Sequence, residues 1–267
     1  MNDETARSEE LVYGTGGGRE LKADLFRPAG EGAGPFPTVV YVHGGGWRQG
    51  DRKHFARQAA HMAEHGFLGL CIEYRLSDEA TYPAALQDVN CAVRFVRAAA
   101  DWLNADPDHV GIAGGSAGGH LAAMVAVTGG TSRWEGTGGH GDCSSEVQAY
   151  VGFNPVVDLR DRSELEAVVQ FLGGTPEEVG EDLYEEASPI CHVDSDTPPS
   201  VLLHGTDDGT VPYEQSVRFC EAVREAGGHA ELFTAEGASH AFFNGPPWFE
   251  PTLKSMREFF TRWLAEA

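Results

Sequence analysis

Apolar runs alternate with amphipathic stretches along the whole chain, which is the pattern of a parallel β-sheet covered by helices on both faces. The clearest run covers residues 38–43 (TVVYVH), is stopped by three glycines and predicts a buried central strand. A second strand, predicted at 67–74, follows a helix-like stretch at about 53–64 and completes one β-α-β unit. Further strands are predicted at 110–113, 150–153, 200–204 and 230–233.

Two longer segments between the strands have helical patterns. From residue 83 to 102, apolar side chains recur three or four positions apart, with Pro83 near the first turn. Residues 158–199 are acidic and helix-like in patches, and we interpret them as a small helical excursion over one edge of the sheet. The sequence therefore predicts one α/β domain over residues 1–267, with a mostly parallel central sheet and residues 1–10 as a flexible N-terminal segment.

The composition excludes several classes of partner. The 267 residues are 41% hydrophobic, and 41 acidic residues against 19 basic ones give a formal charge of −22. A negative field of this size repels nucleic acid and anionic membranes, so we expect neither as a partner. The chain shows no membrane span and no signal-peptide pattern, which predicts a cytoplasmic protein, or a secreted one whose signal peptide was removed. Nothing in the sequence indicates the oligomeric state.

The cysteines and most histidines show no metal-binding or redox pattern. The five cysteines lack a C-x-x-C spacing and are interpreted as buried or unreactive thiols. A disulfide between Cys143 and Cys191, which lie outside the predicted strands and helices, stays open as an alternative. The histidines other than His43 and His240 lack a metal-ligand spacing, and no phosphate-binding P-loop is present. We therefore expect no metal and no cofactor.

The segment Gly114-Gly115-Ser116-Ala117-Gly118 fits the pattern Gly-x-Ser-x-Gly between a predicted strand and a predicted helix. A serine on such a sharp turn needs small neighbours, because the turn brings the flanking backbone close together. The same turn places the amide of Ala117 at a helix N-terminus, where it can stabilise a developing oxyanion.

The other parts of a serine-hydrolase site are also present, and the acid and the histidine follow Ser116 in the order Ser, acid, His that goes with a serine on a strand-to-helix turn. At 43–47 (HGGGW), three glycines after the strongest strand leave backbone amides free to point into a site. After the strand at 200–204, Asp207 and Asp208 are both candidates for the acid that orients a histidine. His240 lies on a glycine-containing loop after the last predicted strand and is the candidate base.

These residues resemble the α/β-hydrolase superfamily, and within it the hormone-sensitive-lipase-like esterases and the bifunctional acetylxylan/feruloyl esterases. The resemblance implies an α/β-hydrolase fold with Ser116 as nucleophile, His240 as base and Asp208 as acid, Asp207 being the alternative acid. The implied oxyanion donors are the amides of Gly44 or Gly45 and of Ala117. The motifs that carry the resemblance are HGGGW at 43–47, YRL at 74–76, YPAALQDV at 82–89, GGSAGG at 114–119, ASPI at 187–190, HGTDDGTVP at 204–212 and SHAFFNGPPW at 239–248.

Two departures from the hormone-sensitive-lipase pattern favour the sugar-ester group: YRLSDE replaces YRLAPE, and Gly115 precedes the serine. The function implied is a serine carboxylic ester hydrolase that forms an acyl-enzyme on short-chain or carbohydrate-linked (acetyl, feruloyl) esters. Small-molecule or polysaccharide-linked esters are the expected substrates. Arylformamidase, small oligopeptidase and a binding module on a hydrolase scaffold are the alternatives. Aromatic side chains that can line the substrate pocket are Trp47, Phe242, Phe243 and Trp248.

Overall fold

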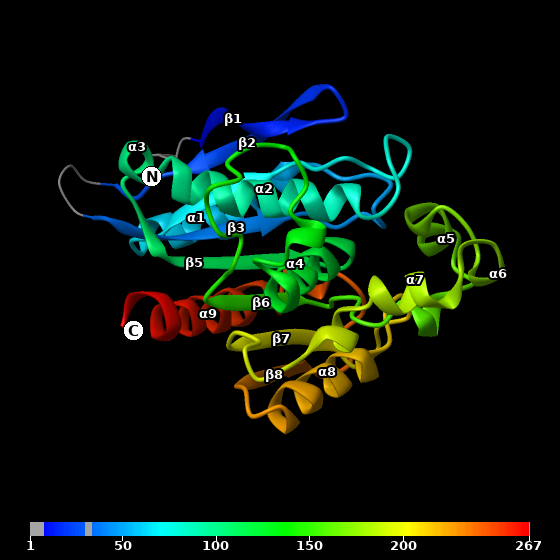
Figure 1. Cartoon of the computed structure of the whole chain (residues 1–267). Helices are drawn as coiled ribbons and strands as arrows, with labels where there is room; N and C mark the ends of the chain where they lie inside the picture. Colours follow the sequence, from blue (N-terminus) through cyan, green and yellow to red (C-terminus); the bar gives the residue numbers. More distant parts are fainter. Residues whose placement is uncertain (1–7, 30–33, 267) are drawn as a thin grey trace.

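A computed structural model describes residues 8–29 and 34–266. Its strands form one eight-stranded sheet, which helices flank (Figure 1). The strand order is β1-β2-β4-β3-β5-β6-β7-β8. From β4 to β8 all neighbouring strands are parallel, as the alternation of strands and helices predicts. The strands are β1 (Ser8–Gly16), β2 (Arg19–Phe26), β3 (Phe36–Val42), β4 (Leu68–Ile72), β5 (Ala105–Gly115), β6 (Ala149–Phe153), β7 (Ser200–Gly205) and β8 (Ala230–Ala235).

The first two strands were not expected from the sequence. They form an antiparallel hairpin, and β2 also pairs antiparallel with β4, so the hairpin extends one edge of the sheet. The prediction of a flexible segment at 1–10 is wrong for residues 8–10, which belong to β1 and pair with residues 24–26 of β2. The rest of that segment, residues 1–7, lies outside the described residues.

Helices cover both faces of the sheet, as predicted. Successive residues of a strand point to opposite faces, and in the central strands the residues on both faces are apolar and buried. In β3, Val39 and Tyr41 pack with α1 and α9, whereas Val40 and Val42 join the cluster that contains α2, α4 and α8. The main helices are α1 (Ala56–Glu64), α2 (Ala84–Ala98), α3 (Ala100–Leu103), α4 (Ala117–Thr128), α8 (Tyr213–Glu225) and α9 (Phe249–Phe260). The helix predicted at 83–102 is thus divided, because Ala99 ends α2 before the short α3.

The predicted excursion at 158–199 is helical and lies beyond the carboxyl ends of the parallel strands (Figure 1). It is held there by the indole of Trp47, which stacks on Phe171 with ring centroids 4.7 Å apart. The backbone amide of Tyr82 also donates to the carbonyl of Phe171. The helical elements of the excursion are η3 (Arg160–Arg162), α5 (Glu166–Leu172), α6 (Pro176–Val179), α7 (Glu181–Glu186) and η4 (Pro189–His192).

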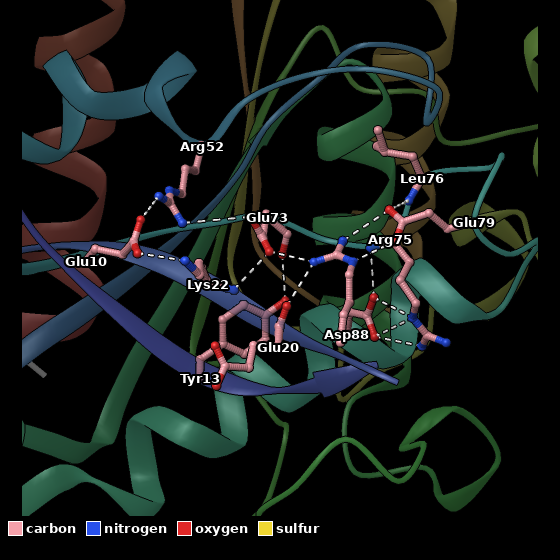
Figure 2. A network of polar contacts seen from close by, with 11 residues as sticks. Glu10, Tyr13, Glu20, Lys22, Arg52, Glu73, Arg75, Leu76, Glu79 and Asp88 are labelled. Atoms are coloured by element: carbon pink, nitrogen blue, oxygen red, sulfur yellow. Dashed lines mark hydrogen bonds and ion pairs between the residues drawn. The ribbon is translucent and has the colours of Figure 1, made fainter. Parts of the chain in front are cut away.

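A buried ion pair between Arg75 and Asp88 ties the segment after β4 to α2, as Figure 2 shows. Asp88 is 1% exposed and accepts from the backbone amide of Arg75 and from two nitrogens of its guanidinium, the closest 2.7 Å away. Burial raises the pKa of Asp88, and the hydrogen bonds from Arg75 oppose that rise. Gly16 of the hairpin lies against the pair, where a Cβ would come within 2.7 Å of Arg75 Nε. The ion pair therefore also packs against the β1–β2 hairpin.

All five cysteines lie in the described part of the chain and are free thiols, three of them buried. The alternative of a Cys143–Cys191 disulfide is therefore wrong for this structure. None of the described helices is long and apolar enough to cross a membrane.

Candidate active site

Ser116 lies on the turn between β5 and α4, with the left-handed backbone conformation φ 54°, ψ −120°. The turn is tight enough to require glycine on both sides. A Cβ on Gly118 would lie 2.2 Å from the carbonyl oxygens of Val42 and His43, and one on Gly114 would lie 2.2 Å from that of Gly118. This packing raises the serine hydroxyl at the carboxyl end of the sheet, which is the nucleophile-elbow geometry that the motif predicts.

A hydrogen-bonded chain connects Ser116 with His240 and Asp208. Ser116 Oγ lies 3.0 Å from His240 Nε2, and His240 Nδ1 lies 2.7 Å from Asp208 Oδ2. Because an ionised carboxylate only accepts, Nδ1 carries the ring proton and Nε2 is left to accept the serine hydroxyl proton. Chemically, the arrangement can activate the serine as a nucleophile.

Asp208, and not its neighbour Asp207, reaches the histidine. Its side chain is fully buried, and Oδ1 accepts from the amides of Thr210 at 2.8 Å and Val211 at 2.9 Å. Burial alone would raise the pKa of Asp208, but hydrogen bonds from His204 and His240 hold it well below its usual range. Asp207 is exposed.

His204, interpreted from the sequence as structural, contacts the same carboxylate. Its Nε2 lies 3.0 Å from the carbonyl oxygen of Val211 and 3.3 Å from Asp208 Oδ2. Its Nδ1 lies 2.7 Å from Ser216 Oγ. Because the Val211 carbonyl can only accept, His204 Nε2 carries the proton and points it at both oxygens.

The glycine loop after β3 packs directly on the serine turn. A Cβ on Gly44 would lie 2.8 Å from the carbonyl oxygen of Gly115, and Gly45 has a φ of +123°. His43 helps to fix the conformation of the glycine loop. Its ring stacks on Tyr74, with centroids 4.4 Å apart, and its Nδ1 donates to the Gly44 carbonyl. Burial lowers the pKa of His43 to about 4, so the ring is neutral at physiological pH.

Two cavities meet at Ser116. The large cavity, of about 430 Å³, lies on the side of His240, and the small cavity, of about 80 Å³, lies under α5. The large cavity is lined by Gly44, Gly45, Gly46, His54, Phe55, Gly115, Ser116, Asn154, Thr210, His240, Ala241, Phe243 and Asn244. The small cavity is lined by Gly46, Trp47, Ser116, Ala117, Val156, Arg162, Leu165, Ala167, Val168, Thr210 and Val211.

Of the four aromatic residues expected at the pocket, Phe243 lines the large cavity and Trp47 the small one. Trp47 is buried, and its Nε1 donates to His120 Nδ1 at 3.2 Å. Phe242 and Trp248 are absent from the described residues that line either cavity. They pack edge to face on each other in the adjoining core, so the structure does not support a pocket role for them.

Asn154, which sequence reasoning missed, lies beside the histidine. It is fully buried at the end of β6, and its Nδ2 is 3.5 Å from His240 Nε2. Its Oδ1 accepts from the amide of Ala241, which holds the histidine loop in place. The sequence signal was its position directly after a predicted strand, since the carboxyl ends of parallel strands meet at one edge of the sheet.

One surface group in the described residues brings three potential metal ligands together, contrary to the sequence interpretation of the histidines. His61 and Glu64 of α1 and His65, which caps its C-terminus, have ligand atoms within 4.8 Å of one another. However, Arg257 Nη1 lies 3.1 Å from His65 Nε2 and 3.5 Å from His61 Nε2. A guanidinium therefore already faces the ring nitrogens that a metal cation would need.

The sheet order, the strained serine turn and the Ser–His–Asp chain define an α/β hydrolase, which confirms the predicted fold class. A family model described as BD-FAE matches residues 23–223, and the chain therefore belongs to the BD-FAE family.

Known proteins similar to this chain carry esterase names. The "Probable carboxylic ester hydrolase LipM" of Mycobacterium tuberculosis is 32% identical over 82% of this chain and 52% of its own length. "Esterase LipQ" of the same organism is 33% identical over 89% of this chain and 58% of its own length. The chain thus spans a little over half the length of these curated relatives.

Solved structures of an esterase from Thermogutta terrifontis match 97–99% of this chain. Its butyrate-bound form superposes with a TM-score of 0.85 at 31% identity, covering 99% of this chain and 98% of the other. The propionate-bound form has a TM-score of 0.83 at 32% identity, with 97% and 95% covered. A form described as phosphorylated by paraoxon has a TM-score of 0.84 at 32% identity, with 97% and 95% covered.

Proposed function

We propose that this protein is a serine carboxylic ester hydrolase that acts through an acyl-enzyme on short-chain or carbohydrate-linked esters. The observation that carries the proposal is the hydrogen-bonded chain from Ser116 through His240 to Asp208, at the meeting point of two cavities. Support also comes from the esterase names of the relatives and from the propionate and butyrate bound in similar structures. The BD-FAE family membership favours acetyl or feruloyl esters of sugars among the substrates.

In the proposed reaction, Ser116 Oγ attacks the ester carbonyl carbon while its proton passes to His240 Nε2. The carbonyl oxygen takes the negative charge and accepts from the amides of Gly44 or Gly45 and of Ala117. The bond to the alcohol oxygen then breaks, and His240 returns the proton to that oxygen. Water repeats the sequence on the acyl-enzyme and releases a carboxylic acid and the free serine.

The test is initial rates of the wild type beside Ser116→Ala, with Ser132→Ala as a matched control because Ser132 is exposed and lies outside both cavities. Suitable substrates are p-nitrophenyl acetate and butyrate, acetylated xylan, methyl ferulate and N-formylkynurenine. We expect Ser116→Ala to lose ester turnover and to keep its melting temperature, and Ser132→Ala to retain both. An unchanged rate in Ser116→Ala would refute the proposal, and turnover of N-formylkynurenine alone would favour arylformamidase.

A further inference from the structure

We propose that Asn154 is a further catalytic residue, whose side-chain amide donates a hydrogen bond to the oxygen of the departing alcohol and then to the water that attacks the acyl-enzyme. The inference rests on the proposed function and deepens it by adding a donor beside His240. It starts from a buried polar group that faces the site. Asn154 is fully buried and lines the large cavity, and in the described part of the chain the one acceptor of its Nδ2 is His240 Nε2, 3.5 Å away.

The neighbouring backbone fixes which end of the Asn154 amide faces the histidine. The N–H of Ala241 can only donate, so the Asn154 atom that lies 3.2 Å from this nitrogen is the oxygen, Oδ1. The NH₂ group is therefore turned toward His240. The backbone amide of Asn154 donates to the carbonyl oxygen of Leu203 on β7, which holds the residue at the carboxyl end of the sheet. The direction of the donor is thus set by the fold itself.

The imidazole of His240 does not satisfy this donor. Its Nε2 has one lone pair, and Ser116 Oγ lies 3.0 Å from it, closer than Asn154 Nδ2 at 3.5 Å. When Nε2 takes the proton of Ser116, the ring nitrogen also becomes a donor, and two N–H groups then face each other. A buried donor without an acceptor costs free energy, which an oxygen placed beside both nitrogens recovers.

The reaction brings such an oxygen to this position when the alcohol departs. His240 Nε2 must pass its proton to the ester oxygen, which requires that oxygen within about 3 Å of the ring nitrogen. Two nitrogens 3.5 Å apart can both lie about 3 Å from one oxygen, so Asn154 Nδ2 can donate to it as well. As the bond from the carbonyl carbon breaks, the ester oxygen keeps the electron pair. Its growing negative charge strengthens the hydrogen bond from Asn154.

The second half of the reaction uses the same position, because water then takes the place of the alcohol. The water passes a proton to His240 Nε2, and its oxygen bonds to the acyl carbon. The bond from that carbon to Ser116 Oγ then breaks, and Oγ receives the proton from His240. Asn154 Nδ2 donates a hydrogen bond to the water oxygen throughout and so fixes its position, while the amide itself keeps both of its protons.

The backbone of Asn154 offers a competing explanation for the residue. Its φ is +39°, a left-handed value that asparagine tolerates better than most residues. Asn154→Gly keeps this backbone and removes the side chain, whereas Asn154→Asp keeps the oxygen that accepts from Ala241. The loss common to both variants is the NH₂ donor. Asn104→Asp is the matched control, because Asn104 also has a left-handed φ, of +58°, and precedes the amino end of β5, away from both cavities.

The first readout is kcat/KM, which reports acylation, on ethyl butyrate and p-nitrophenyl butyrate. Both esters form the same acyl-enzyme, but p-nitrophenolate is a stable anion that departs without a donor, whereas the oxygen of ethanol needs one. We expect both Asn154 variants to lose about 10- to 100-fold on ethyl butyrate and less than about threefold on p-nitrophenyl butyrate. Asn104→Asp should keep both rates. Equal losses on the two esters would assign Asn154 a structural role and overturn the inference, as would full activity of either variant on ethyl butyrate.

The second readout is stopped-flow kinetics on p-nitrophenyl butyrate. Because acylation stays fast while the attack of water slows, we expect a burst of p-nitrophenol equal to the enzyme concentration, followed by a kcat about 10- to 100-fold below the wild type. Intact-mass spectrometry should find the butyryl group on the variants. A kcat that falls only as far as kcat/KM, without a burst, would refute the role toward water.

Melting temperatures check that each Asn154 variant folds, and one folded variant is enough to decide. The result also separates the inference from the proposed function. If the wild type turns over both esters and the variants show no selective loss, the role of Asn154 fails and the ester hydrolase function stands. Absence of turnover of either ester by the wild type would instead overturn the proposed function.

Discussion

The carboxylate of Asp208 offers the sharpest test of the site, because its surroundings dictate how an amide would sit in its place. In Asp208→Asn, the oxygen of the amide must take the Oδ1 position, since that position faces two backbone N–H donors, those of Thr210 and Val211. The amide NH₂ must then take the Oδ2 position and donate to His240 Nδ1. The proton of the imidazole moves to Nε2, which can no longer accept the proton of Ser116.

The expected loss in kcat is about 10³- to 10⁴-fold, which corresponds to about 4–5.5 kcal/mol of transition-state stabilisation. The substituted NH₂ also faces the N–H of His204, and this donor–donor contact should lower the free energy of unfolding by about 1–3 kcal/mol. We would measure kcat and KM on p-nitrophenyl butyrate and unfold each variant in urea. The two readouts separate the catalytic loss from the structural one.

Asp207→Asn is the matched control, because Asp207 is the neighbouring residue with the same side chain and is exposed. We expect its kcat to stay within about twofold of the wild type. The reasoning fails if Asp208→Asn keeps more than about a tenth of the wild-type kcat, or if Asp207→Asn is the more damaged variant.

Two further predictions concern stability. The pKa of Asp208 is depressed in the folded state, so its ionised form stabilises the fold above the unfolded-state pKa of about 3.9, and this stabilisation is lost as pH falls below it. The advantage of the wild type over Asp208→Asn in urea unfolding should therefore shrink from pH 6 to pH 3, and a difference independent of pH would contradict this. Arg75→Met leaves the Asp88 carboxylate buried without its partner and should cost about 3–5 kcal/mol, measured by urea unfolding, whereas adding Asp88→Asn should recover part of the loss; no recovery in the double variant would argue against the buried pair.

The positions of the Ser–His–Asp chain were predictable from the sequence, except for the choice between two neighbouring aspartates. Ser116 needs a left-handed turn flanked by glycines, and the spacing of the glycines records that requirement. His240 and the two aspartates follow strands, so the parallel sheet brings them to one edge. The choice between Asp207 and Asp208 came from resemblance alone, because both residues follow the same strand and differ only in which way the turn directs the side chain.

The N-terminal hairpin was missed although part of its signal is present. In β2, Leu21, Ala23 and Leu25 are buried and alternate with more polar residues, which is the period of a strand. The preceding β1 is mostly exposed at the edge of the sheet, and its polar residues conceal the pattern. An edge strand gains much of its stability from pairing with its neighbour, and the alternation of apolar and polar residues in its own sequence does not reveal that pairing.

The walls of the cavities depend on tertiary structure that no local pattern encodes. Val168 reaches the small cavity because the 158–199 excursion folds back over the strand ends, about fifty residues along the chain from Ser116. Phe242 and Phe243, which follow His240, show that even neighbouring residues cannot be placed from the local sequence. Ala241 has a φ of +60° and begins a single 3₁₀ turn, in which Phe243 lines the large cavity and Phe242 packs against Trp248 in the core. Adjacent residues of one type therefore face different surroundings, and the local sequence predicts that aromatic side chains gather near the histidine without predicting which of them reaches the substrate.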